Sequence, residues 1–75
     1  MPAASTEIAA EMVANVLTVA VSVGDTVAAG DTVCLLESMK MEIPVLVERA
    51  GTVTEVKVVP GDVVSEGDVL VVLAH

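Results

Sequence analysis

Residues 16–31 read VLTVAVSVGDTVAAGD, and the same arrangement of valine, glycine and aspartate returns in residues 53–68, which read VTEVKVVPGDVVSEGD. Both stretches follow the pattern V-x-x-V-x-V-x-x-G-D-x-V-x-x-G-D. When residues 13–38 are aligned on residues 50–75, nine of the 26 positions are identical, and four of those nine are glycine or aspartate. Two repeats predict two similar units related by a pseudo-two-fold axis, because a solenoid needs at least about three repeats.

Each repeat is typical of a strand, a turn, a short strand, a second turn and a final strand. In the second repeat valines alternate with Glu55 and Lys57, which predicts a half-buried strand with a polar outer side. The three-residue step from Val16 to Val19 breaks this period, as does its equivalent in the second repeat, so we expect a β-bulge in both. The four Gly-Asp pairs predict turns in which glycine supplies a positive φ and aspartate binds nearby N–H groups. Their spacing is not that of an EF-hand, and no metal site is expected.

Composition predicts one small all-β domain that spans residues 1–75. Valine supplies 18 of the 75 residues and there is no aromatic residue, so the core has to be aliphatic. β-Branched side chains at this density favour strands over helices.

The charge and the termini exclude several classes of function. The formal net charge is −8, and the only basic residues are Lys40, Arg49 and Lys57. Nucleic acids and anionic membranes are therefore unsuitable partners. The mean hydropathy is +0.85, yet no apolar run approaches the roughly 20 residues of a spanning helix. Met1–Glu7 lacks the basic region of a signal peptide, and a single cysteine, Cys34, excludes a disulfide framework. We expect a soluble cytoplasmic protein, monomeric when isolated.

The segment Glu37-Ser38-Met39-Lys40-Met41-Glu42 lies at the junction of the two units. It separates two strand-like stretches, Thr32–Glu37 and Ile43–Val47, and is therefore expected to form the tip of a β-hairpin. Tight hairpin turns normally use Asn-Gly, Asp-Gly or Gly-Gly, because their central residues adopt positive φ. The second unit has no copy of this lysine, so the symmetry of the scaffold does not explain it.

The pairing across this hairpin is also unfavourable. If Met39 and Lys40 are the two central residues, Glu37 and Glu42 face each other across the strands, and such a like-charge pair costs stability. A tip that breaks several local rules at once is where a function is expected.

Met39-Lys40-Met41 resembles the biotin-attachment site of biotinyl domains, the family of the biotin carboxyl carrier proteins. The resemblance extends from about Glu7 to Leu73 and is closest to the short free-standing biotinylated proteins of actinobacterial type. Four other stretches resemble family motifs: Ala10–Val16, Val23–Asp31, Ala50–Val53 and Val59–Gly67. Three residues depart from the usual pattern, with Glu11 in place of proline, Ala14 in place of glycine and Ser38 in place of alanine. The chain between Val21 and Val27 is too short for the protruding thumb that some bacterial carriers insert there.

The resemblance implies a flattened β-barrel, a barrel-sandwich hybrid of two four-stranded antiparallel sheets, with biotin joined covalently to Lys40. A biotin protein ligase would attach the biotin, and the chain would carry carboxybiotin between the biotin carboxylase and carboxyltransferase of a biotin-dependent, acyl-CoA carboxylase. Met39 and Met41 offer flexible apolar contacts for ligase recognition. Ser38, Glu37 and Glu42 are the residues of the hairpin that flank this tip. The chain has no catalytic constellation of His, Ser and Cys, so it is expected to be a carrier and not an enzyme.

Two other functions use the same scaffold. A lipoyl domain of a 2-oxoacid dehydrogenase is the nearer one, although that family typically has Asp-Lys-Ala at its tip. The other is an unmodified assembly module, in which Lys40 is an ordinary solvated lysine.

Several residues have structural alternatives. Met39 and Met41 can instead pack under a neighbouring loop, since methionine is first a core residue. Cys34 is expected to be a buried structural thiol, and Lys57 a solvated lysine. Pro44 is expected at an edge or a twisted position of a sheet, because proline cannot donate to a strand ladder. His75 has no partner suggested by the sequence and receives no role.

Overall fold

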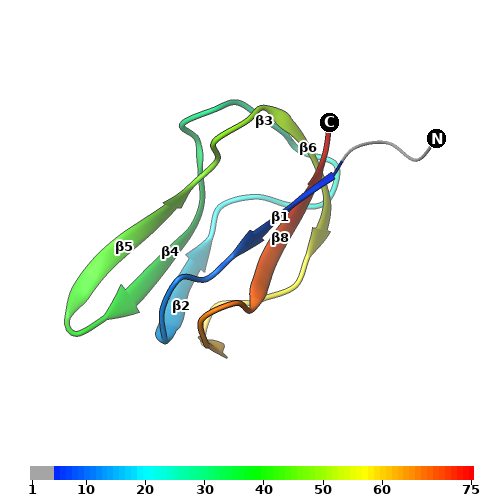
Figure 1. Cartoon of the computed structure of the whole chain (residues 1–75). Helices are drawn as coiled ribbons and strands as arrows, with labels where there is room; N and C mark the ends of the chain where they lie inside the picture. The colour runs from blue at the N-terminus through cyan, green and yellow to red at the C-terminus, as the bar shows by residue number, and fades with distance from the viewer. Residues whose placement is uncertain (1–4) are drawn as a thin grey trace.

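The computed structural model describes residues 5–75 and is all-β, as expected (Figure 1). The strands form two four-stranded antiparallel sheets, ordered β1-β8-β6-β3 and β5-β4-β2-β7. Their bounds are β1 Ser5–Ala9, β2 Ala14–Val19, β3 Thr26–Val27, β4 Thr32–Ser38, β5 Met41–Leu46, β6 Gly51–Val56, β7 Val63–Val64 and β8 Val69–Ala74. The expected domain limits of 1–75 and the N-terminal stretch Met1–Glu7 both include residues 1–4, which lie outside the described residues. Within residues 5–75 no helix is long and apolar enough to cross a membrane.

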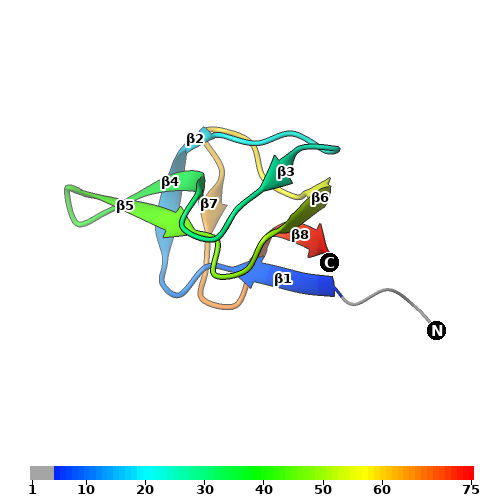
Figure 2. The same cartoon turned by 90° about the horizontal axis from the view of Figure 1, so that it is seen from above.

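The two repeated units are intertwined. The first unit contributes its short strand β3 to the sheet of β6 and β8, and the second contributes β7 to the sheet of β2 and β4, as Figure 2 shows from above. The backbone contacts are reciprocal. Gly24 N–H donates to the Val53 carbonyl at 2.8 Å, and Gly61 N–H donates to the Val16 carbonyl at 2.8 Å. The expected pseudo-two-fold relation therefore extends to single hydrogen bonds.

The structure makes each unit longer than the sequence indicated. Ser5 pairs with Ala74 in β1 and β8, just as Glu42 pairs with Glu37 in β5 and β4. The units are thus residues 5–38 and 42–75, and only residues 39–41 join them. The alignment of residues 13–38 on residues 50–75 covers only part of each unit, because residues 5–12 and 42–49 share a single identity and so gave no sequence signal.

The four Gly-Asp turns have one geometry. Their glycines have φ between 89° and 98°, which side chains rarely adopt, as expected for the third residue of a type II turn. In each turn an aspartate Oδ2 accepts the N–H of the residue three positions earlier, at 2.8–3.0 Å. Within residues 5–75 no three His, Cys, Asp or Glu side chains gather as metal ligands would.

The core lies between the sheets and is aliphatic and symmetric. All fourteen buried side chains of residues 5–75 are apolar, and twelve of them form six pairs that stand 37 residues apart in the chain. These pairs are Ala10/Val47, Val16/Val53, Val27/Val64, Val33/Leu70, Cys34/Val71 and Leu36/Leu73. The strand registers also shift between Val16 and Thr18 and between Val53 and Glu55, which confirms the expected bulge in each unit.

Candidate functional site

A two-residue turn at the tip of the β4–β5 hairpin carries the candidate lysine. Met39 has a φ of 53° and Lys40 a φ of 64°, so both central residues are left-handed, as in a type I′ turn. Every other positive φ in residues 5–75 belongs to a glycine. A left-handed conformation costs a residue with a Cβ about 1–2 kcal/mol, so the chain maintains a strained turn at this point.

The expected register of the hairpin is confirmed. Ser38 pairs with Met41, and Glu37 with Glu42. The pair that flanks a two-residue turn is hydrogen-bonded, so the next pair, Glu37 and Glu42, is a non-hydrogen-bonded one, where side chains stand closest. Two carboxylates thus oppose each other across the hairpin, one residue pair further from the turn than Ser38 and Met41. Pro44 is also on β5, which is an edge strand, as expected.

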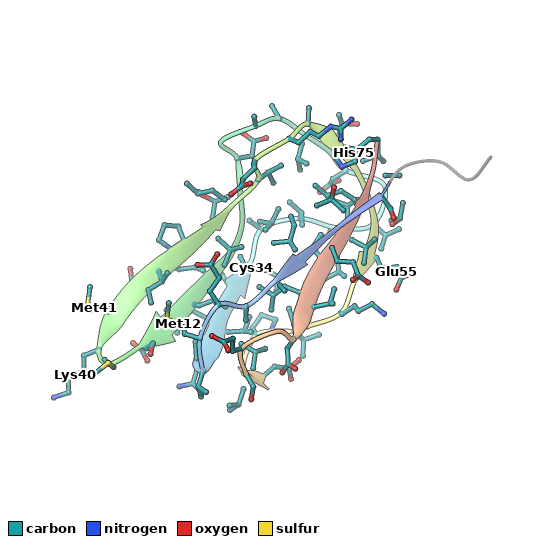
Figure 3. The ribbon with its side chains drawn as sticks, in the orientation of Figure 1. Met12, Cys34, Lys40, Met41, Glu55 and His75 are labelled. Atoms are coloured by element: carbon teal, nitrogen blue, oxygen red, sulfur yellow. The ribbon has the colours of Figure 1, made fainter. Side chains whose placement is uncertain are left out.

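The side chains of the tip are exposed. Met39 is 92% exposed and Met41 is 65% exposed, so the alternative in which they pack under a loop is wrong. Lys40 is exposed too, and its side chain extends away from the body of the protein (Figure 3). The only ion pair within residues 5–75 joins Lys57 to Glu55, so Lys40 Nζ is not held by a carboxylate.

This arrangement presents a primary amine on a rigid support. Such an amine can attack an activated carbonyl and form an amide, once a base has taken its proton. The two antiparallel strands fix where the amine stands, which lowers the entropy cost of presenting it to an enzyme. The hairpin offers no general base oriented on Nζ, so a second protein has to supply the catalysis. The surroundings are open enough for Lys40 to bear a covalent group.

Comparison with known proteins identifies the family. Residues 1–73 match the model of the biotin/lipoyl attachment domain, which is described as "biotin-requiring enzyme". The chain belongs to this family. As a biotin/lipoyl attachment domain it is related to free-standing biotinylated proteins and to the biotinyl domains of carboxylases, which are carriers rather than catalysts.

Two relatives of this attachment domain are short proteins of similar length. It is 53% identical to the biotinylated protein TB7.3 homolog of Mycobacterium leprae over 91% of this chain and 96% of the relative. It is 49% identical to the biotin/lipoyl attachment protein of Bacillus subtilis over 87% and 89% of the two chains. Its fold matches a domain of a single-chain, multi-domain long-chain acyl-CoA carboxylase with a TM-score of 0.91 and 31% identity, covering all of this chain and 8% of that one.

Two other candidate residues of the attachment domain have structural roles. Cys34 is buried in β4, and this burial raises the pKa of its thiol, which confirms the expected structural cysteine. Lys57 Nζ lies 2.9 Å from Glu55 Oε2 on the surface. The hydrogen bond to Glu55 raises the pKa of Lys57, which favours the charged amine and makes Lys57 a poor competing acceptor.

His75 has partners that the sequence did not suggest. Its Nδ1 lies 2.8 Å from the Ala50 carbonyl oxygen, and its Nε2 contacts the hydroxyl of Thr6. Nδ1 faces a carbonyl oxygen and therefore donates, whereas a hydroxyl group such as that of Thr6 can either donate or accept. The ring thus ties the end of β8 to the segment before β6 and to β1. These partners lie 25 and 69 residues away in the chain, so local sequence patterns could not indicate them.

Three exposed apolar side chains near the hairpin were also missed as functional candidates. Met12, Val13 and Val63 are 37%, 64% and 69% exposed. Val63 pairs with Asn15, which pairs in turn with Glu37, so Val63 lies in the same row across the sheet as the base of the hairpin. Comparing each residue with its equivalent in the other unit would have singled them out.

Proposed function

We propose that the protein is a biotin carboxyl carrier and that Lys40 is its attachment residue. The observation that carries this proposal is the turn itself. An exposed lysine occupies a strained, left-handed position between two exposed methionines, at a place where Asn-Gly would fold more favourably. The names of the M. leprae and B. subtilis relatives support biotin as the group attached.

In the proposed modification, the deprotonated Nζ of Lys40 attacks the carbonyl carbon of biotinyl adenylate. An amide bond forms, the bond from that carbonyl to the phosphate oxygen breaks, AMP leaves, and a base on the ligase accepts the amine proton. Met39 and Met41 provide apolar contacts to the ligase, while Ser38, Glu37 and Glu42 fix and surround the turn. Because Met39 and Met41 are exposed, they are available for such contacts without local unfolding.

When bound to Lys40, biotin would supply the group on which a carboxyl is carried from a biotin carboxylase to a carboxyltransferase. The chain contributes a fixed point of attachment and a hairpin that reaches away from both sheets (Figure 3). The likeness to a domain of a long-chain acyl-CoA carboxylase supports an acyl-CoA carboxylase as the enzyme served. We further propose a single domain over residues 1–75 that works as a cytoplasmic monomer, where ligase and ATP are available.

The proposal is tested by modifying the purified, unmodified protein with biotin, Mg-ATP and an active biotin ligase. Intact-mass spectrometry and peptide mapping should find one biotinyl group on Lys40. The Lys40→Arg variant should remain unmodified, while the matched control Lys57→Arg should be modified as the parent is. Modification elsewhere, or none at all, would contradict the assignment of Lys40.

A lipoyl group is the second candidate, because the matched family includes lipoyl attachment domains. The same protein incubated with lipoate, Mg-ATP and a lipoate ligase should stay unmodified. Acylation by the lipoate ligase alone would transfer the protein to the lipoyl carriers. If neither ligase modifies it, an unmodified assembly module is the remaining function.

A further inference from the structure

Because the two units are symmetric, a surface residue of one unit can be compared with its equivalent in the other. Residues 10–15, 37–42 and 61–68 gather at the end of the molecule that carries Lys40, which we call the tip end. Their equivalents in the other unit lie at the opposite end, together with the start of β1 and the end of β8 (Figure 1); we call it the terminal end. Because the backbone is duplicated, a difference between equivalent residues is not required by the fold.

Exposed apolar side chains are concentrated at the tip end. Of the eight large exposed apolar residues in residues 5–75, five belong to the tip end; Val23 and Leu46 directly adjoin the ranges of the terminal end, and Val59 belongs to the turn at Gly61. Met12, Val13 and Val63 correspond to Arg49, Ala50 and Thr26, which are also exposed and are a charged, a small and a polar residue. Folding thus tolerates polar side chains at these positions, and the tip end uses apolar ones instead.

The apolar residues lie beside the hairpin. Asn15 of β2 pairs with Glu37 of β4, so Val13, two residues before Asn15, lies at the end of β2 that is next to the tip of the hairpin. Met12 and Ile43 line one hollow between the β1–β2 connection and β5. Figure 3 shows Met12 near the hairpin whose tip carries Lys40 and Met41. Met12, Val13 and Val63 therefore lie at the same end of the molecule as the tip; we call these three residues the tip surface.

The tip end also carries more negative charge than the terminal end. The tip end has six carboxylates and one cation, Lys40, while the terminal end has three carboxylates and one cation, Arg49. Glu37, Glu42 and Glu66 correspond to Ala74, Ser5 and Ala29 in the other unit. Acylation of Lys40 removes the one cation of the tip end, so the modified protein presents an apolar surface with a wholly acidic rim.

We propose that the tip surface is the docking site for a partner with an apolar centre and a rim of lysine and arginine, and that this partner is the biotin carboxylase that loads the modified lysine. The inference rests on the proposed function. A basic rim complements the acidic one, and complementary charges speed association and fix the register of docking. A basic rim on the partner also favours binding of the acylated form, since loss of the Lys40 charge removes the repulsion between that lysine and the rim. The ligase receives the unmodified lysine, so it lacks this reason for a basic rim.

The test exchanges equivalent residues. The triple variant Met12→Arg, Val13→Ala, Val63→Thr gives the tip end the side chains that the terminal end already carries. The control triple variant Thr26→Val, Arg49→Met, Ala50→Val makes the reverse exchange at the terminal end. All three proteins are biotinylated, checked by mass, and titrated as substrates of the biotin carboxylase of the same organism with bicarbonate and ATP. Thermal unfolding of each protein confirms that it is folded.

The tip variant should raise the KM for the carrier about tenfold and change kcat about twofold or less, as loss of a docking contact does. The control variant should match the parent. Glu66→Ala should raise the KM at low salt about twofold to threefold, whereas Ala29→Glu should not.

The outcomes separate this inference from the proposed function. If the parent is neither biotinylated nor carboxylated, the proposed function fails. If the parent is carboxylated but the tip variant keeps the same KM, the docking inference alone is wrong. If the tip variant loses only its reaction with the ligase, the surface belongs to the ligase, and the assignment to the carboxylase is overturned.

Discussion

The left-handed turn predicts an inverted order of two simple substitutions. Lys40→Ala and Lys40→Gly remove the same charge and the same long side chain, and they differ only in the Cβ. At an ordinary exposed position alanine is the more stabilising residue by about 0.4–1 kcal/mol, because glycine has more unfolded conformations to lose. At Lys40, with a φ of 64°, alanine also bears the left-handed cost of about 1–2 kcal/mol, which glycine avoids.

We therefore expect Lys40→Gly to be more stable than Lys40→Ala by about 0.5–1 kcal/mol. The matched pair is Lys57→Gly and Lys57→Ala, at an exposed lysine without positive φ, where alanine should be the more stable. The difference between the two pairs is the cost of the left-handed conformation itself.

Urea unfolding of the four unmodified proteins measures this, with the free energy of unfolding taken from the midpoint at a common slope. A gain of 1 kcal/mol also corresponds to a rise of about 4–8 °C in Tm for a domain of this size. If alanine is as stable as glycine at position 40, the turn does not store this strain, and the physical argument for a functional tip is refuted.

Three further results are expected. Gly51→Ala should destabilise the fold by about 1–3 kcal/mol in urea unfolding, because the new Cβ would stand 2.7 Å from the Ala74 carbonyl oxygen. Burial raises the pKa of the Cys34 thiol, so only the unfolded thiol ionises as the pH rises above about 8.5, and the free energy of unfolding should fall there. Cys34→Val gives this position the residue of its equivalent, Val71, and should remove that part of the loss in urea titrations across pH. His75→Ala should cost about 0.5–1.5 kcal/mol in the same assay through loss of the bond to the Ala50 carbonyl; an unchanged midpoint would mean that this contact is not formed in solution.

Much of the fold was predictable because it depends on local rules. The bulges followed from a three-residue step between valines, and the turns from Gly-Asp pairs, each of which constrains only its own neighbours. The register of the hairpin followed from placing Met39 and Lys40 at its centre. These signals were enough to predict three strands of each unit in their order along the chain, and to single out the tip.

The rest depends on contacts between distant segments. β1 and β5 are equivalent in space but share almost no sequence, because an edge strand needs only a suitable alternation of side chains. His75 binds partners from two other segments, which no single stretch of sequence indicates. The asymmetric tip surface became visible only when the exposure of equivalent residues could be compared.

The equivalence of the two chain junctions has a consequence for engineering. Residues 39–41 join residue 38 to residue 42, and the symmetry makes this step the counterpart of a link from residue 75 to residue 5. A three-residue Met-Lys-Met linker between those ends, with the chain opened at the present hairpin, would give a circular permutant with the same strands and core. Its acceptor lysine would stand at the opposite pole, away from Met12, Val13 and Val63. The position of the acceptor and the surface around it can thus be separated by changing only the connectivity of the backbone.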